Sequence, residues 1–250
     1  MTKLSQAVIA WMLGVIPTAQ ADTFTYDLNG SFAPADRSQP ALDPNGGTLG
    51  PTGYTFGVDQ GLTLRHTAFD VYSIEIKFDF ANLAASPNGF QKIIDFKNRT
   101  SDSGLYSVCC LPATPGADLS LFAMGGSGDP SAEAFIPGFT NGTMMDLRVT
   151  RDVNGLFSAF VNGQLVFSVK DLDGATIFSG QVDHTINFFM DDLLSRGVEA
   201  GPGFVNYIQV ITPDAPVSVP GPIVGVGLPG LLGMLGFGGY GWWRRRQKIA

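Results

Sequence analysis

The segment Val71–Phe80 constrains the fold more than any other part of the chain, because it alternates strictly between apolar and polar side chains. Its apolar members are Tyr72, Ile74, Ile76, Phe78 and Phe80. Successive side chains of a β-strand point to opposite faces, so a period of two predicts a strand with one face in the core and one in water. Two packed antiparallel sheets satisfy such a pattern.

Two Asn-Gly pairs, Asn154-Gly155 and Asn162-Gly163, indicate tight turns further along the chain. Asn-Gly tolerates the positive φ that a type I′ turn requires at both central positions, and it is the strongest short hairpin signal. We therefore predict a three-stranded meander. Its strands are Leu147–Arg151, Leu156–Val161 and Gln164–Val169.

Short runs of the same type recur through the rest of the middle of the chain, and no long helical period appears between Asp22 and Ile211. The 32 glycines and 19 phenylalanines suit short strands joined by tight turns. We predict an all-β, two-sheet antiparallel sandwich over residues 22–211. Its other strands are Thr23–Leu28, Tyr54–Val58, Leu62–Arg65, Phe90–Phe96, Leu105–Cys109, Leu119–Met124, Thr185–Met190 and Phe204–Ile211.

The first 21 residues have the three parts of a secretory signal peptide. Lys3 precedes an apolar run from Ala7 to Ile16, and Ala19 and Ala21 form an A-x-A cleavage site. The apolar run is too short for a stable membrane anchor. We expect export and cleavage after Ala21; the alternative is an amphipathic first helix.

The other end of the chain has the pattern of a membrane anchor. Residues 223–243 carry no charge and are long enough to cross a hydrocarbon core of roughly 30 Å as a helix. A Pro-rich spacer, residues 212–222, precedes them, and a basic tail, residues 244–250, follows on the expected cytoplasmic side. The alternative is a buried hydrophobic helix of the domain.

The order of these C-terminal parts resembles a PEP-CTERM sorting tail. Its signature position reads Val219-Pro220-Gly221-Pro222, where the common form is Pro-Glu-Pro, and the apolar span ends in a cluster of arginines. The arginines are Arg244, Arg245 and Arg246. The resemblance implies an exosortase-like protease of the inner membrane as a partner, with the domain at the cell surface or released after cleavage.

Five stretches of the middle segment resemble the strands of concanavalin A-like (laminin-G-like) jelly rolls. They are Tyr72–Phe78, Lys92–Lys97, Gly104–Val108, Leu147–Gly163 and Phe188–Ile208. The resemblance covers most of residues 22–211. It implies a jelly-roll sandwich that binds carbohydrate in many members, and that in exported members often holds structural calcium between a late loop and an early strand.

Charge narrows the range of partners. All 22 acidic residues lie between Asp22 and Asp214, together with only 10 of the 15 basic residues. An acidic domain of this kind binds polyanions poorly, which argues against nucleic acid and leaves cations or neutral sugars.

No sequence pattern for catalysis is present. The three glutamates, Glu75, Glu133 and Glu199, do not form the Glu-x-Asp-x-Glu pattern that glucanases of the jelly-roll class place on one strand. G-x-S-x-G, H-E-x-x-H and Walker motifs do not occur. We expect no enzymatic activity.

Asp191, Asp192 and Glu199 share a short loop with two glycines. Ca²⁺ prefers six to eight hard oxygen ligands, and an acidic loop can wrap one ion. Asp70, before an early strand, is the candidate fourth ligand. The alternative is a solvated acidic turn in which Asp192 pairs with Arg196.

The adjacent cysteines, Cys109 and Cys110, are either two separate side chains on a strand or partners in an intermolecular or vicinal disulfide. The function most consistent with these features is a non-catalytic envelope or matrix protein that binds polysaccharide or a surface protein. The alternatives are a purely structural surface protein and a glycoside hydrolase or lyase.

Overall fold

The computed structural model describes residues 21–36, 39–65, 70–87, 89–109, 116–122, 131–178, 185–193 and 198–212. All of them belong to one compact unit, Ala21–Pro213. Ala19, the sorting signature at residues 219–222, the predicted span 223–243 and Arg244–Arg246 lie outside the described residues. Within the described ranges, no helix is long and apolar enough to cross a membrane.

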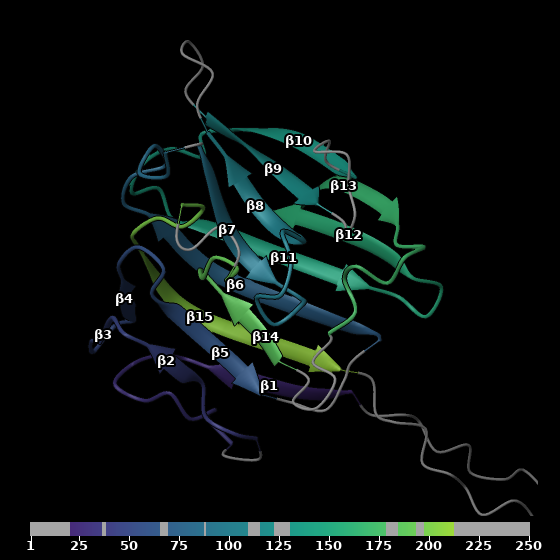
Figure 1. The fold of residues 1–250 in the computed structure, drawn as a ribbon. Coiled ribbons are helices and arrows are strands. Elements are labelled where there is room, and N and C mark those ends of the chain that lie inside the picture. The colour runs from purple at the N-terminus through teal and green to yellow at the C-terminus, as the bar shows by residue number, and fades with distance from the viewer. Residues whose placement is uncertain are drawn as a thin grey trace, which may run out of the picture. The chain divides into compact units, whose positions relative to one another are not determined.

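The described chain forms two antiparallel sheets, one lying over the other in Figure 1. Sheet 1 contains, in order, β13 (Gln164–Lys170), β12 (Leu156–Val161), β11 (Met145–Arg151), β6 (Tyr72–Phe80), β15 (Gly203–Thr212), β4 (Tyr54–Phe56) and β3 (Thr48–Leu49), with β1 (Asp22–Tyr26) also paired to β15. Sheet 2 contains β10 (Ala132–Pro137), β9 (Gly116–Phe122), β8 (Gly104–Val108), β7 (Phe90–Asp95), β14 (Thr185–Phe188), β5 (Gly61–Arg65) and β2 (Asp43–Asn45). The predicted all-β, two-sheet jelly-roll sandwich of concanavalin A-like type is confirmed.

The alternating segment is β6, in the middle of sheet 1 between β11 and β15. Ile74 and Ile76 are fully buried, and Phe78 and Phe80 are 1% exposed, so the apolar face of the strand lies in the core between the sheets. β6 pairs with a strand on each side, so its backbone N–H and C=O groups find partners along the nine residues of the strand.

The predicted meander is β11, β12 and β13. Its second turn has positive φ at both Asn162 and Gly163, as expected for a two-residue hairpin. The first turn differs, since there only Gly155 has positive φ. Asp152 Oδ1 accepts backbone N–H bonds from Asn154 and Leu156, both at 2.8 Å, and these bonds stabilise a longer loop in place of a type I′ turn.

The state of Cys109, which directly follows β8, excludes one of the alternatives predicted for the two cysteines. Cys109 is disulfide-bonded, so it is not a separate thiol on a strand. The other cysteine of the chain, Cys110, lies outside the described residues.

Candidate functional site

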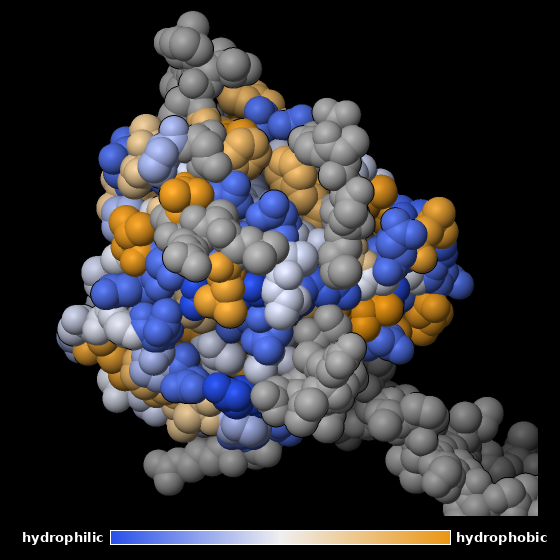
Figure 2. Space-filling model, in the orientation of Figure 1, coloured by the Kyte–Doolittle hydropathy of each residue, from blue (hydrophilic) through white to orange (hydrophobic). Residues whose placement is uncertain are grey.

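The outer face of sheet 2 carries the densest group of interacting charges. Hydrophilic residues gather over β2, β5 and β14 on this face (Figure 2). In β7 a register shift between Lys92 and Ile94 marks a bulge. The bulge lets Ile93 and Ile94 both lie in the core, while Lys92 and Asp95 meet on the outer side.

Lys92 is a lysine whose side chain has no exposed surface. Its ammonium lies 3.2 Å from Asp192 Oδ2, 3.4 Å from Asp95 Oδ2 and 3.4 Å from the carbonyl oxygen of Ser101. It also lies 5.0 Å from the centre of the Tyr106 ring. A buried charge is tolerated only when it is paired and hydrogen-bonded, so these contacts fix Lys92 as the positive centre of the site.

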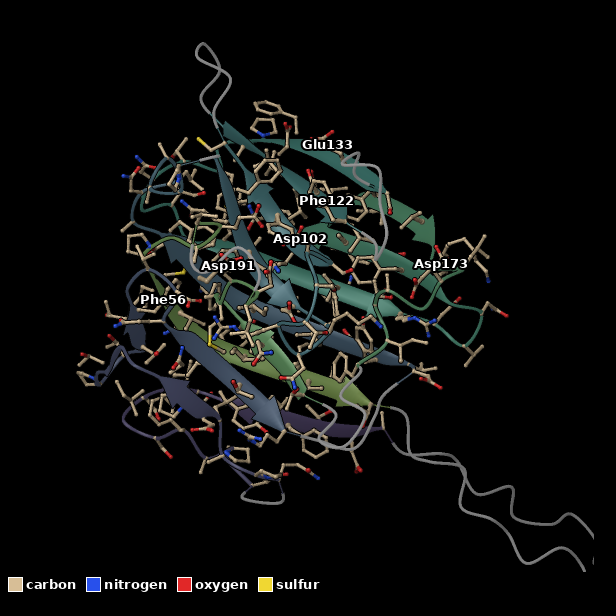
Figure 3. The ribbon with its side chains drawn as sticks, viewed as in Figure 1. Phe56, Asp102, Phe122, Glu133, Asp173 and Asp191 are labelled. Atoms are coloured by element: carbon tan, nitrogen blue, oxygen red, sulfur yellow. The ribbon has the colours of Figure 1, made fainter. Side chains whose placement is uncertain are left out.

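Three carboxylates lie next to this ammonium and form what we call the acidic cluster: Asp102, Asp192 and Glu199. One carboxylate oxygen from each lies within 4.8 Å of the other two. Asp102 comes from the loop between β7 and β8, whereas Asp192 and Glu199 come from the two ends of the segment between β14 and β15. Figure 3 shows Asp102 and the neighbouring Asp191 near the middle of this face.

Two buried aspartates shape the loops that carry the acidic cluster. Asp191 accepts the backbone N–H of Asp192 at 2.8 Å on one carboxylate oxygen and that of Glu199 at 3.1 Å on the other. Asp95 accepts the backbone N–H groups of Lys97 at 2.9 Å and Arg99 at 2.8 Å. Both side chains therefore use backbone donors to position loop residues, as aspartates in tight turns commonly do.

An unusual backbone conformation anchors the segment that begins after β14. Phe189 has φ of 63°, which is rare for an aromatic residue, and its N–H donates to the carbonyl of Ile93 at 3.1 Å. Its ring is buried and stacks on Phe56 with 4.4 Å between the ring centres. Packing in the core therefore holds the left-handed turn that sends Asp191 and Asp192 onto the outer face.

Several carboxylates lie close together around Lys92. Asp95 and Asp192 pair with its ammonium, and Asp102 and Glu199 lie beside Asp192. A hydrogen bond with Asp192, then burial, then the negative charge of Asp192 raise the pKa of Asp102. Burial raises the pKa of Asp95, although Lys92 opposes the effect. Carboxylates this close are stabilised by a shared proton or by a nearby cation.

The structure brings together two of the four residues predicted from sequence, Asp192 and Glu199. Asp191 lies behind them and holds them in place through their backbone N–H groups. Asp70 is not among the three clustered carboxylates; its carbonyl oxygen accepts a hydrogen bond from Arg151. Asp102 was missed, although it is the only acid in the loop between the predicted strands Phe90–Phe96 and Leu105–Cys109.

A pocket of about 240 Å³, here called the polar pocket, opens on the same face. It is lined by Asp43–Asn45 of β2, Thr63 and Arg65 of β5, Asn187 of β14, Met190, and Asn98 with Arg99 from the loop after β7. Polar groups dominate this lining, and its described residues include no aromatic side chain.

Arg99 connects the polar pocket with the acidic cluster. Its Nη2 lies 2.7 and 2.9 Å from the two carboxylate oxygens of Asp59, and its Nε donates to the carbonyl of Asp191. Asp59 in turn accepts the backbone N–H of Asp191 at 3.0 Å. This bidentate pair has a fixed geometry, so the pocket wall and the segment bearing Asp191 and Asp192 form one hydrogen-bonded unit.

No family model and no curated protein matches the chain. Among solved structures, the binding domain of botulinum neurotoxin serotype D is similar, with a TM-score of 0.50 and 13% identity over 76% of this chain and 47% of that one. This chain thus spans about half of that domain. An apo Crh5 transglycosylase has a TM-score of 0.49 and 16% identity over 78% of this chain and 85% of that one. The metal-free carbohydrate recognition domain of Emp46p has a TM-score of 0.44 and 14% identity over 70% and 89%.

At these identities the similarity concerns the fold alone. The fold and the outer face of sheet 2 together define the class: a concanavalin A-like jelly-roll sandwich with an acidic cluster beside a polar pocket.

Proposed function

We propose that this chain is an exported, non-catalytic surface or matrix protein whose β-sandwich binds glycan and holds a calcium ion at the acidic cluster. The observation that carries the proposal is the position of the acidic cluster on the same face as the polar pocket, whose lining residue Arg99 donates to the backbone carbonyl of Asp191, the neighbour of Asp192. Binding residues commonly lie on loops that a rigid scaffold positions, as the loops beside sheet 2 are here.

The acidic cluster fits calcium by chemistry and by size. Ca²⁺ binds carboxylate and carbonyl oxygens at about 2.3–2.6 Å, so two oxygens on one ion lie at most about 5 Å apart. The carboxylate oxygens of Asp102, Asp192 and Glu199 lie within 4.8 Å of one another. These three side chains would hold the ion, whose charge would offset the repulsion between them.

The burial of Asp192 supports a binding function better than a catalytic one. A retaining glycosidase needs two carboxyl groups about 5 Å apart, one of which must reach the sugar carbon. Asp192 is fully buried and paired with Lys92, which favours a role in holding an ion over a direct attack on a sugar carbon. Glu75 lies on β6 of sheet 1 and accepts a hydrogen bond from Tyr207. A glycoside hydrolase or lyase and a purely structural protein remain the competing functions.

Export and sorting are proposed from the terminal segments of the sequence. The intact mass of the protein from its host, measured separately in membrane and released fractions, tests this part. We expect a mature form that begins at Asp22 and ends near Val219–Pro222. A membrane form that still ends at Ala250 would make the tail a plain anchor and exclude exosortase cleavage.

A glycan array tests the binding function. The mature protein is applied with Ca²⁺ and again with EDTA, and reducing-sugar release is followed on the same polysaccharides. We expect reproducible binding that EDTA weakens, without sugar release. Absence of binding across a broad panel would favour a purely structural protein, and sugar release would show a hydrolase.

A further inference from the structure

We propose that the polar pocket is the subsite for one neutral sugar residue, which it recognises through two neighbouring hydroxyl groups. The inference rests on the glycan-binding function proposed above, and it names the location and the chemical class of the ligand. Asn187, Asp43 and Arg65 would make the contacts.

The first observation is an unpartnered donor on Asn187. Ile186 and Phe188 of β14 lie in the core, so Asn187 between them faces outward and lines the pocket. Asn187 is only 2% exposed, and its Oδ1 accepts the hydroxyl of Thr63 at 2.8 Å. The other polar atom, Nδ2, is buried and has no partner among the described residues. Buried donors are rarely left unpaired, and a ligand oxygen would satisfy this one.

The second observation is an open ion pair at the rim. Arg65 and Asp43 lie 3.5 Å apart, and their side chains are 56% and 60% exposed. An exposed pair of this length contributes little stability, so Asp43 can turn toward a ligand with little loss from this pair. Each sugar hydroxyl donates one hydrogen bond and accepts others. Two adjacent hydroxyls therefore match a carboxylate acceptor beside guanidinium and amide donors.

The size of the pocket limits the ligand. Sites for drug-sized molecules have volumes of roughly 300–1,000 Å³, and this pocket has about 240 Å³. One sugar ring fits that scale better than an oligosaccharide. Pro44 and Met190 supply apolar surface for the C–H groups of the ring. Without an aromatic platform the single contact is expected to be weak, and repeated residues along a glycan would strengthen it.

Charge selects a neutral sugar. Nη2 of Arg99 is bound by Asp59 and its Nε by the carbonyl of Asp191. The acidic cluster lies on the same face, and the domain is acidic as a whole. A carboxylated or sulfated sugar would be repelled by this net charge, so uronates and sulfated glycans should bind more weakly than neutral sugars.

The test uses the mature protein and two variants of the exposed rim, Asp43→Asn and Arg65→Met, with Asp173→Asn as control. Asp173 is exposed, is not among the residues that line the pocket, and lies well to the side of Asp191 in Figure 3. Binding is measured by calorimetry with methyl glucoside, methyl mannoside and methyl galactoside, with glucuronate as the acidic probe, and with the strongest neutral glycan from the array. Melting temperatures show that each variant is folded.

We expect each rim variant to lose roughly tenfold in affinity, as the loss of one hydrogen-bond partner implies, and the control to bind as the unaltered protein does. Unaltered binding by both rim variants would overturn the subsite while leaving glycan binding in place. Tighter binding of glucuronate than of neutral sugars would overturn the sugar class. No binding of any glycan by the unaltered protein would remove both proposals.

Discussion

Two carboxylate centres of this sandwich differ in how their charge is held. At the first, Asp171 accepts the guanidinium Nε of Arg151 at 3.0 Å and the hydroxyl of Thr176 at 2.6 Å. It also accepts the backbone N–H groups of Ala175 at 2.7 Å and Thr176 at 3.1 Å. Burial would raise the pKa of Asp171, but the hydrogen bonds from Thr176 and Arg151 outweigh it and lower that pKa.

At the second centre, the acidic cluster, three carboxylates and Asp95 share one ammonium, and the pKa of Asp102 is raised mainly by its contact with Asp192. The carboxylate of Asp171 is held by several donors of the protein. At the acidic cluster several carboxylates lie close together, and a shared proton or a bound cation would stabilise that arrangement. We therefore infer that Asp171 stabilises the fold, whereas the acidic cluster is suited to bind a ligand.

The largest expected effect is on stability, at the Asp171 centre. Asp171→Ala should lower the free energy of unfolding by about 3–5 kcal/mol, because it leaves the guanidinium of Arg151 buried without its partner. Urea denaturation measures the change. Asp173→Ala, two residues away and exposed, is the control and should stay within about 0.5 kcal/mol of the unaltered protein. A loss below about 1 kcal/mol for Asp171→Ala would mean that the two centres do not differ as argued.

The next largest effect is the change in stability when calcium binds at the acidic cluster. Saturation at one hundred times the dissociation constant should add about 2.7 kcal/mol to the free energy of unfolding of the EDTA-treated protein. Asp102→Asn removes one charged ligand from an exposed position, so it should abolish most of the gain without unfolding the domain. Asp173→Asn should keep the full response. Calorimetric melting with and without Ca²⁺ decides the matter, and an unchanged melting temperature in the unaltered protein would exclude the calcium site.

Much of this fold could be predicted from the sequence, but the edges of the sheets could not. β6 and the meander follow from alternation and Asn-Gly turns, which are local signals. β2 contains Pro44 and β10 ends at Pro137, and proline removes the strand signal although edge strands accept it. β2 and β10 are indeed the terminal strands of sheet 2.

The candidate site was predictable only in part, because its members are brought together by pairing between distant strands. Asp192 and Glu199 are close in sequence and formed a visible acidic loop. Asp102 and Lys92 lie close to these two residues because β7 pairs with β14 and because a bulge in β7 turns Lys92 outward. Neither the pairing nor the bulge is marked by a pattern in the neighbouring sequence. Asp70 lies by the other centre, where its carbonyl oxygen accepts a hydrogen bond from Arg151.

A smaller effect is the opposite pH dependence of the two centres in EDTA. The raised pKa of Asp102 means that its contribution to stability is complete below the pKa of an unfolded aspartate, near 3.9, and is lost as pH rises through the folded value. The lowered pKa of Asp171 gives the reverse, with stability present above that value and lost as pH falls through the folded pKa.

Melting temperatures between pH 3 and 7 separate these contributions when Asp102→Asn and Asp171→Asn are each compared with the unaltered protein in EDTA. The difference between the unaltered protein and Asp102→Asn should shrink or change sign as pH rises, whereas the difference for Asp171→Asn should grow. If the two melting-temperature differences change with pH in the same direction, the pKa values of Asp102 and Asp171 are not shifted in opposite directions. With Ca²⁺ present, the pH dependence of the difference between the unaltered protein and Asp102→Asn should disappear.

The smallest expected effect links the acidic cluster to sugar binding. Arg99 and Asp59 hold both the wall of the polar pocket and the backbone of Asp191, so the loss of calcium should loosen the pocket indirectly. We expect EDTA to weaken neutral-sugar binding a few-fold. Asp59→Asn should weaken binding by a similar amount in Ca²⁺ and reduce the additional loss on EDTA, because the connection is already broken. If EDTA acts equally on Asp59→Asn and on the unaltered protein, the coupling runs through other contacts, and the Arg99–Asp59 pair only shapes the pocket.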